Sequence, residues 1–155
     1  YGRAGKNILI GRFEGRNIPK GNIMTAAEQS GYRYVLHIDG HVAAYRLGRE
    51  LDYNSCILKM EGYEDYKLWF SDQLKPYDGT NEGEANIINV TLDGLMKEIK
   101  SIMKEENVSS KIAKNAKELY GEIMTKEYMT KYMKEKLNMI SSNFVTFRKP
   151  DKRNA

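Results

Sequence analysis

The chain has 155 residues, a length that suits one domain with a single hydrophobic core and is too short for two full α/β lobes. Its composition, 41% hydrophobic and 30% charged with only 3 prolines, excludes collagen-like, low-complexity and wholly disordered chains. The net charge is +4, but residues 21–95 are acidic, with six Lys or Arg against twelve Asp or Glu. We therefore expect no nucleic-acid partner. No apolar run approaches the ~20 residues of a bilayer span, and we expect no membrane segment.

The N-terminal part predicts little regular structure. Residues 7–10 form a short apolar run that favours a small strand or an extended arm, and residues 11–22 contain the Gly and Pro residues typical of a loop. The chain starts at Tyr1 without an initiating Met, which suggests a fragment or a processed product. We therefore interpret residues 1–22 as an N-terminal arm or the end of a preceding lobe.

The first strand–helix pair follows a short capped helix. Thr25, with Glu28 three residues later, has the pattern of a capping box and predicts a helix over residues 26–30. Residues 32–38 are β-branched and aromatic enough for a strand, and an Asp-Gly turn then leads into the helical sequence of residues 43–51.

A second pair follows, in which residues 55–60 predict a buried strand. Cys56 lies in this run, so we expect a buried, inert thiol and a reducing compartment. The spacing of large apolar residues over 65–74 predicts a helix. Its aromatic side chains could stack on a nucleobase, although helical spacing favours core packing. The aromatic residues in question are Tyr63, Tyr66, Trp69 and Phe70.

The rest of the chain is predicted to be mainly helical. Residues 78–84 form a polar, glycine-containing loop, and residues 86–90 predict a third strand. Three helices are expected after this strand, over residues 92–106, 109–124 and 126–140.

Repeated strand–helix pairs with short connections predict an α/β fold: a Rossmann-like parallel sheet flanked by helices on both faces. We expect this lobe to cover residues 23–145 and to be followed by a basic tail over 146–155. Ligands of such sheets bind beyond the carboxyl ends of the strands, where glycine turns present backbone N–H groups to phosphate. The turn after residue 38 is therefore the first candidate site.

This turn has features of a diphosphate site. Gly40 lacks a Cβ, so the backbone there can approach a ligand closely, and Arg46 is near enough to pair with the same phosphate. An Asp-Gly turn followed by a surface cation is an equally good interpretation from spacing alone.

Two histidines flank Asp39 in this turn, but we expect no metal site. His37 and His41 have no third ligand nearby in the sequence, and alternate strand residues point to opposite faces. We interpret His37 as a core imidazole with its hydrogen bonds satisfied. Asp39 could be a general base, although its position favours a role in the turn and in capping the helix.

The sequence from residue 24 to about 130 resembles the CAP10-like O-glycosyltransferases, glycosyltransferase family 90, especially the forms found in large DNA viruses. The motifs that carry the resemblance are Tyr32-Arg33-Tyr34, Ile38-Asp39-Gly40, Ala43-Ala44 with Arg46, Ser55 with Leu58, Trp69-Phe70, and Leu74-Lys75-Pro76-Tyr77. The resemblance implies the C-terminal, nucleotide-sugar-binding lobe of a GT-B glycosyltransferase. The location stays open, because eukaryotic relatives work in the secretory pathway, and we favour a viral or host-cytoplasmic one.

The resemblance also implies roles for individual residues. Arg46 would pair with the donor diphosphate, Asp39 would support the turn, and Ser55 would support this loop without touching ligand. The residues whose backbone would contact the diphosphate are Gly40, His41, Val42, Ala43 and Ala44. No catalytic residue is expected in this chain, because the base of the family lies in the N-terminal lobe.

The implied activity is inverting transfer of a sugar from a UDP-sugar to a hydroxyl of a protein or glycan acceptor (EC 2.4), with no cofactor and no metal. The sequence departs from the family pattern after residue 77: it lacks the usual histidine- and tyrosine-containing segment and has the polar loop of residues 78–84 instead. Any ligand contact that this segment makes in the family is therefore in doubt here. Two alternatives remain open, a degenerate non-catalytic lobe that acts as an interaction module and a different GT-B enzyme.

Overall fold

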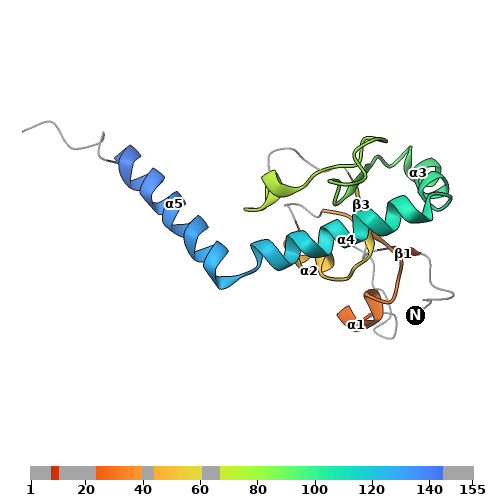
Figure 1. Ribbon diagram of the computed structural model, residues 1–155, viewed down its shortest axis with the longest axis horizontal. Coiled ribbons are helices and arrows are strands. Elements are labelled where there is room, and N and C mark those ends of the chain that lie inside the picture. The colour runs from red at the N-terminus through yellow and green to blue at the C-terminus, as the bar shows by residue number, and fades with distance from the viewer. Residues whose placement is uncertain (1–7, 11–23, 40–43, 61–66, 145–155) are drawn as a thin grey trace, which may run out of the picture. The chain divides into compact units, whose positions relative to one another are not determined.

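A computed structural model describes residues 8–10, 24–39, 44–60 and 67–144. Its centre is a four-stranded, wholly parallel sheet whose strand order follows the chain. The strands are β1 (Ile8–Ile10), β2 (Tyr34–His37), β3 (Cys56–Met60) and β4 (Ile88–Val90) (Figure 1). All four lie within or close to the ranges predicted from the sequence, and their parallel pairing is confirmed.

The two faces of the sheet bury different side chains, because alternate residues of a strand point to opposite sides. One face forms the main core with α3 (Leu95–Ile102) and α4 (Glu106–Ile123). The strand residues on this face are Tyr34, Leu36, Cys56, Leu58, Ile88 and Val90. The opposite face carries His37, which contacts Glu50 of α2 (Arg46–Leu51), so helices cover both faces as predicted.

Local sequence signals explain several of these elements. The capping box at the start of α1 (Ala26–Gln29) is confirmed: Thr25 Oγ1 accepts from the N–H of Glu28, whose carboxylate accepts from the N–H of Thr25 at 2.7 Å. Cys56 is the buried thiol that was predicted, and burial raises its pKa to about 12.

The helix predicted over residues 65–74 is wrong where the structure describes that segment, from residue 67 onward. Only one short 3₁₀ turn, η2 (Ser71–Gln73), forms there. Asn86 is the reason, since its buried side chain accepts from the N–H of Lys75 and donates to the carbonyl of Gln73. These bonds fix an extended exit that a helix would not allow, and Pro76 disfavours helical geometry in the residue before it.

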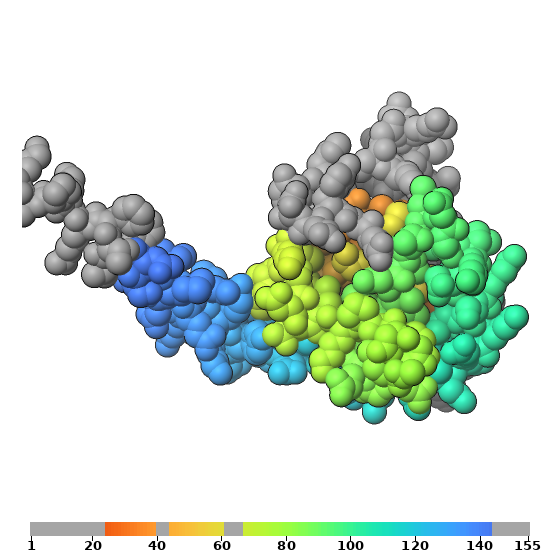
Figure 2. All heavy atoms as spheres, turned by 90° about the horizontal axis from the view of Figure 1, so that it is seen from above, coloured from red at the N-terminus to blue at the C-terminus, as the bar shows by residue number. Residues whose placement is uncertain are grey.

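The polar loop of residues 78–84 is confirmed as a loop and is attached to α4. Asn115 donates from its side chain to the carbonyls of Glu82 and Ala85, and Lys111 forms an ion pair with Glu82. In the space-filling view, the yellow-green part of the chain that contains this loop makes a continuous surface beside the green of α3 (Figure 2).

Helix α3 is shorter than predicted at both ends, α4 starts three residues earlier, and α5 (Lys126–Phe144) extends past residue 140. The chain divides into two compact units, residues 1–121 and 122–155. Within the second unit, α5 has an exposed apolar stripe formed by Met129, Met133, Leu137 and Ile140. None of the described helices is long and apolar enough to cross a membrane.

Candidate functional site

The candidate site lies at the carboxyl end of β2, on the face of the sheet that α2 covers. His37 is the last residue of β2, and Asp39 follows two residues later on the same side. The parallel register places Lys59 of β3 directly beside His37. Three side chains that can carry charge therefore meet at one edge of the sheet, which is where parallel sheets bind ligands.

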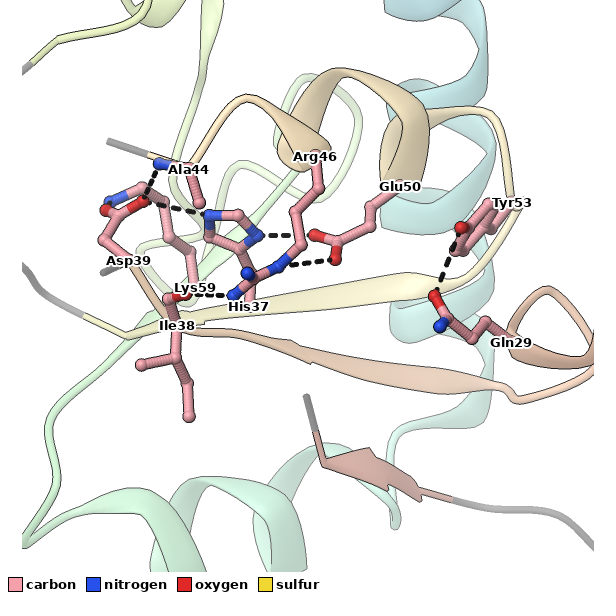
Figure 3. Close-up of polar contacts among 9 residues, drawn as sticks. All are labelled: Gln29, His37, Ile38, Asp39, Ala44, Arg46, Glu50, Tyr53 and Lys59. Carbon is pink, nitrogen blue, oxygen red and sulfur yellow. Dashed lines mark hydrogen bonds and ion pairs between the residues drawn. The ribbon is translucent and has the colours of Figure 1, made fainter. Parts of the chain in front are cut away.

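His37 is fully buried, and both of its ring nitrogens have partners. Nδ1 lies 2.5 Å from Oε2 of Glu50, and Nε2 lies 3.1 Å from Oδ1 of Asp39 (Figure 3). The prediction of a core imidazole with satisfied hydrogen bonds is confirmed. The contacts also join α2 to the end of β2 through a single ring.

Arg46 turns inward toward the same cluster. Its Nε lies 3.3 Å from Oε1 of Glu50, one helical turn further along α2, and its Nη2 donates to the carbonyl oxygen of Ile38. The Arg46 side chain keeps 31% of its surface exposed, so it lies at the boundary between the cluster and solvent. Its guanidinium ties the first turn of α2 to the end of β2.

Asp39 holds the other side of the turn. Its Oδ1 accepts from the backbone N–H of Ala44 at 2.7 Å, and its Oδ2 lies 3.5 Å from Nζ of Lys59. Burial alone would raise the pKa of Asp39, but the Ala44 N–H, the His37 ring and the Lys59 ammonium together outweigh burial and lower it. Asp39 thus serves as an ionised acceptor that closes the turn, the role favoured from the sequence.

The structure places the other predicted residues as follows. Residues 40–43, which include four of the five predicted backbone contacts, lie outside the described residues. Ser55 lies at the amino end of β3, where its hydroxyl donates to the carbonyl of Tyr32 at 2.6 Å. Because Asp39 follows the carboxyl end of the neighbouring strand, Ser55 lies at the opposite end of the sheet from the turn.

Two members of the cluster, Glu50 and Lys59, were not identified from the sequence. The spacing of Arg46 and Glu50 at i and i+4 on one helix was a usable signal for Glu50. No local pattern indicated Lys59, because its position beside Asp39 depends on the strand register. Across the described ranges, no group of three His, Cys, Asp or Glu side chains is arranged to hold a metal ion.

The family model described as glycosyl transferase family 90 matches residues 14–154, which is most of the chain. The chain belongs to glycosyltransferase family 90. The matched range includes the whole cluster at the end of β2, so this arrangement lies inside the family domain.

Viral proteins are similar to this family 90 chain. Uncharacterized protein 035R of Invertebrate iridescent virus 3 is 29% identical over 86% of the chain, and uncharacterized protein 179R of Invertebrate iridescent virus 6 is 29% identical over 84%. Uncharacterized protein 027R of Frog virus 3 is 40% identical over 35% of the chain. The chain spans only 12%, 11% and 6% of the length of these three proteins.

The aromatic motif of this family 90 chain is partly buried. Phe70 lies in the interior, and Trp69 packs edge-on against it with ring centroids 5.4 Å apart. Packing therefore occupies Phe70, as was favoured from the sequence. Tyr63 and Tyr66 lie outside the described residues.

Proposed function

We propose that this chain is the donor-binding part of a family 90 glycosyltransferase that transfers a sugar from a UDP-sugar to a hydroxyl of a protein or glycan acceptor, with inversion. Family membership supports the transferase activity. We place the catalytic base outside this chain, in a preceding lobe of a GT-B arrangement.

The observation that carries the proposal is the position of the turn between β2 and α2 and of the cationic side chains near its two ends. It starts at the carboxyl edge of a central parallel strand, and two cationic side chains, Arg46 and Lys59, lie beside it. We place the donor diphosphate against the backbone of residues 40–44, within reach of Arg46. The N–H of Ala44 already donates to Asp39, so Ala44 contributes chiefly by holding the turn.

The proposed role of these groups is electrostatic. When the glycosidic bond to UDP breaks, negative charge accumulates on the departing diphosphate, and fixed cations and N–H groups nearby stabilise it. The acceptor hydroxyl loses its proton to the carboxylate of the preceding lobe. We expect the cations of the protein to serve in place of a metal ion.

Titration of the chain with UDP by calorimetry tests this proposal, with Arg46→Ala as the decisive variant. The loss of a hydrogen bond to a charged group predicts that UDP binding weakens by about 1.5–3 kcal/mol. Arg49→Ala is the matched control, because Arg49 is an exposed cation on the same helix and should leave the affinity unchanged.

Circular dichroism of both variants shows whether the fold is retained, since Arg46 also pairs with the buried Glu50. If folded Arg46→Ala binds UDP as tightly as the unaltered chain, Arg46 does not contact the donor. If the unaltered chain shows no saturable binding of UDP or UDP-sugars, the donor-binding function is refuted and the interaction-module alternative is favoured.

A further inference from the structure

The cluster around His37 contains ionisable side chains beyond Asp39, the one that accepts from the N–H of Ala44. Glu50 is buried almost completely, with its side chain 5% exposed, and His37 is buried completely. Burying a carboxylate and a titratable ring together is costly unless each is paired and hydrogen-bonded. The contacts of His37 in this cluster therefore bear on the protonation of its ring.

The geometry limits the hydrogen-bonding roles that the ring nitrogens can take. An ionised carboxylate only accepts hydrogen bonds, and each nitrogen of His37 faces a carboxylate oxygen. When both carboxylates are ionised, both ring nitrogens donate and the ring is an imidazolium, which is the state that the proposal below adopts and tests. The charged groups that face one another come from three elements: Glu50 and Arg46 from α2, Lys59 from β3, and His37 and Asp39 at the end of β2.

The cluster connects the two ends of the β2–α2 turn at two points. Arg46 donates to the carbonyl of Ile38, and Asp39 accepts from the N–H of Ala44. His37 joins the two connections, because its ring contacts Asp39 on one side and Glu50, the partner of Arg46, on the other. A change at this ring would loosen both ends of the turn together.

We propose that His37 is a positioning residue: its buried imidazolium, held by Glu50, keeps Asp39 on the Ala44 amide and so fixes the base of the donor-binding turn. This inference rests on the proposed function for its consequence, since the diphosphate would bind on that turn. The state of the ring and of the turn can be measured without any ligand.

The first measurement is the ¹⁵N spectrum of the imidazole rings in the labelled chain at pH 7. The chain has two histidines, so His41→Asn identifies the signals of His37. We expect the imidazolium signature, with protons on both ring nitrogens, for the unaltered chain and for His41→Asn. A neutral His37 ring would overturn the inference, and this arm needs no destabilising variant.

The second measurement uses Glu50→Gln, which keeps the size of the side chain and removes its charge. We expect a neutral His37 ring, exchange of the Ala44 amide with deuterium faster by at least about tenfold, and UDP binding about tenfold weaker, the loss typical of one hydrogen bond to a charged group. Glu118→Gln, which removes an exposed carboxylate on α4, is the matched control and should change none of these.

The outcomes separate the two proposals. Failure of the unaltered chain to bind UDP would refute the proposed function, while the ring and amide results would still decide whether His37 fixes the turn. If Glu50→Gln leaves the Ala44 amide as protected as before, the positioning role is overturned whatever the affinity for UDP.

Discussion

Asp39 illustrates how a single side chain links stability to pH. Its pKa lies below the ordinary value of 3.8 because the Ala44 N–H, the His37 ring and Lys59 together outweigh the effect of burial. A carboxylate whose pKa is lowered by folding stabilises the native state above its unfolded pKa, and that stabilisation disappears as the pH falls through the folded value. The carboxylate of Asp39 should therefore contribute fully at neutral pH and not at all in strong acid.

We accordingly predict that Asp39→Asn lowers the free energy of unfolding at pH 7, and that its difference from the unaltered chain shrinks as the pH falls below about 4. Urea unfolding at a series of pH values measures this difference. Asp72→Asn, at an exposed position in η2, should show no such convergence. If Asp39→Asn lowered the free energy of unfolding by the same amount from pH 7 to pH 3, the lowered pKa of Asp39 would be contradicted.

Among the elements, the segment from η2 to β4 depends on side-chain hydrogen bonds rather than on regular structure. Asn86 accepts from the N–H of Lys75 and donates to the carbonyl of Gln73, and Pro76 pairs with Ile87 in a single parallel bridge. The buried amide of Asn86 thus fixes the path of the chain into β4 together with the backbone hydrogen bonds from Asn86 to Lys75 and from Tyr77 to Ile87.

We predict that Asn86→Ala destabilises the chain by about 1–3 kcal/mol, because the N–H of Lys75 and the carbonyl of Gln73 lose their partner at a partly buried position. Chemical denaturation measures the loss. Asn89→Ala removes the same side chain from an exposed position of β4 and should cost well below 1 kcal/mol. Equal costs for the two variants would show that the Asn86 bonds contribute little.

The elements also show how far the sequence can be interpreted before a structure is known. The strands were predictable because short apolar runs such as Tyr34–Leu36 are bounded by turn residues. The capping box at Thr25 was predictable because both of its partners lie within one helical turn. The helix predicted over residues 65–74, which the structure does not show from residue 67 onward, could not be excluded locally because Asn86, which bonds to that segment, is more than ten residues away.

The same distinction holds at the candidate site. His37 could be predicted as a satisfied core imidazole, since a histidine at the end of a buried strand needs partners. The identity of those partners could not be predicted. Glu50 reaches the ring from another element and Lys59 reaches Asp39 through the strand register, and both placements depend on tertiary packing.

At the scale of the whole molecule, the buried side chains that the structure describes all lie before residue 124. The main core is built from β2, β3, β4, α3 and α4, whereas none of the side chains described in α5 is buried. Burial of apolar area is the dominant favourable contribution to folding, so the core residues should account for the cooperative unfolding of the chain.

We predict that a chain ending at Thr125 retains its urea midpoint within experimental error, while it loses the helical circular dichroism signal of α5. Ile123, which is fully buried at the end of α4, is kept in this shortened chain. A shortened chain ending at Lys117 removes Ile123 and serves as the contrasting variant, which should unfold at lower urea. If the chain that ends at Thr125 lost its cooperative unfolding transition, α5 would be shown to contribute to stability.

The buried contact between His37 and Glu50 has a consequence for how the two positions evolve. Replacing either residue alone removes one of the two charged contacts of its buried partner, because Glu50 also pairs with Arg46 and His37 also contacts Asp39. The loss of a charged contact in the interior is costly, so we expect evolution to preserve the two positions together. In homologues that lost only one of them, the other would depend on its remaining contact, with Arg46 for Glu50 or with Asp39 for His37.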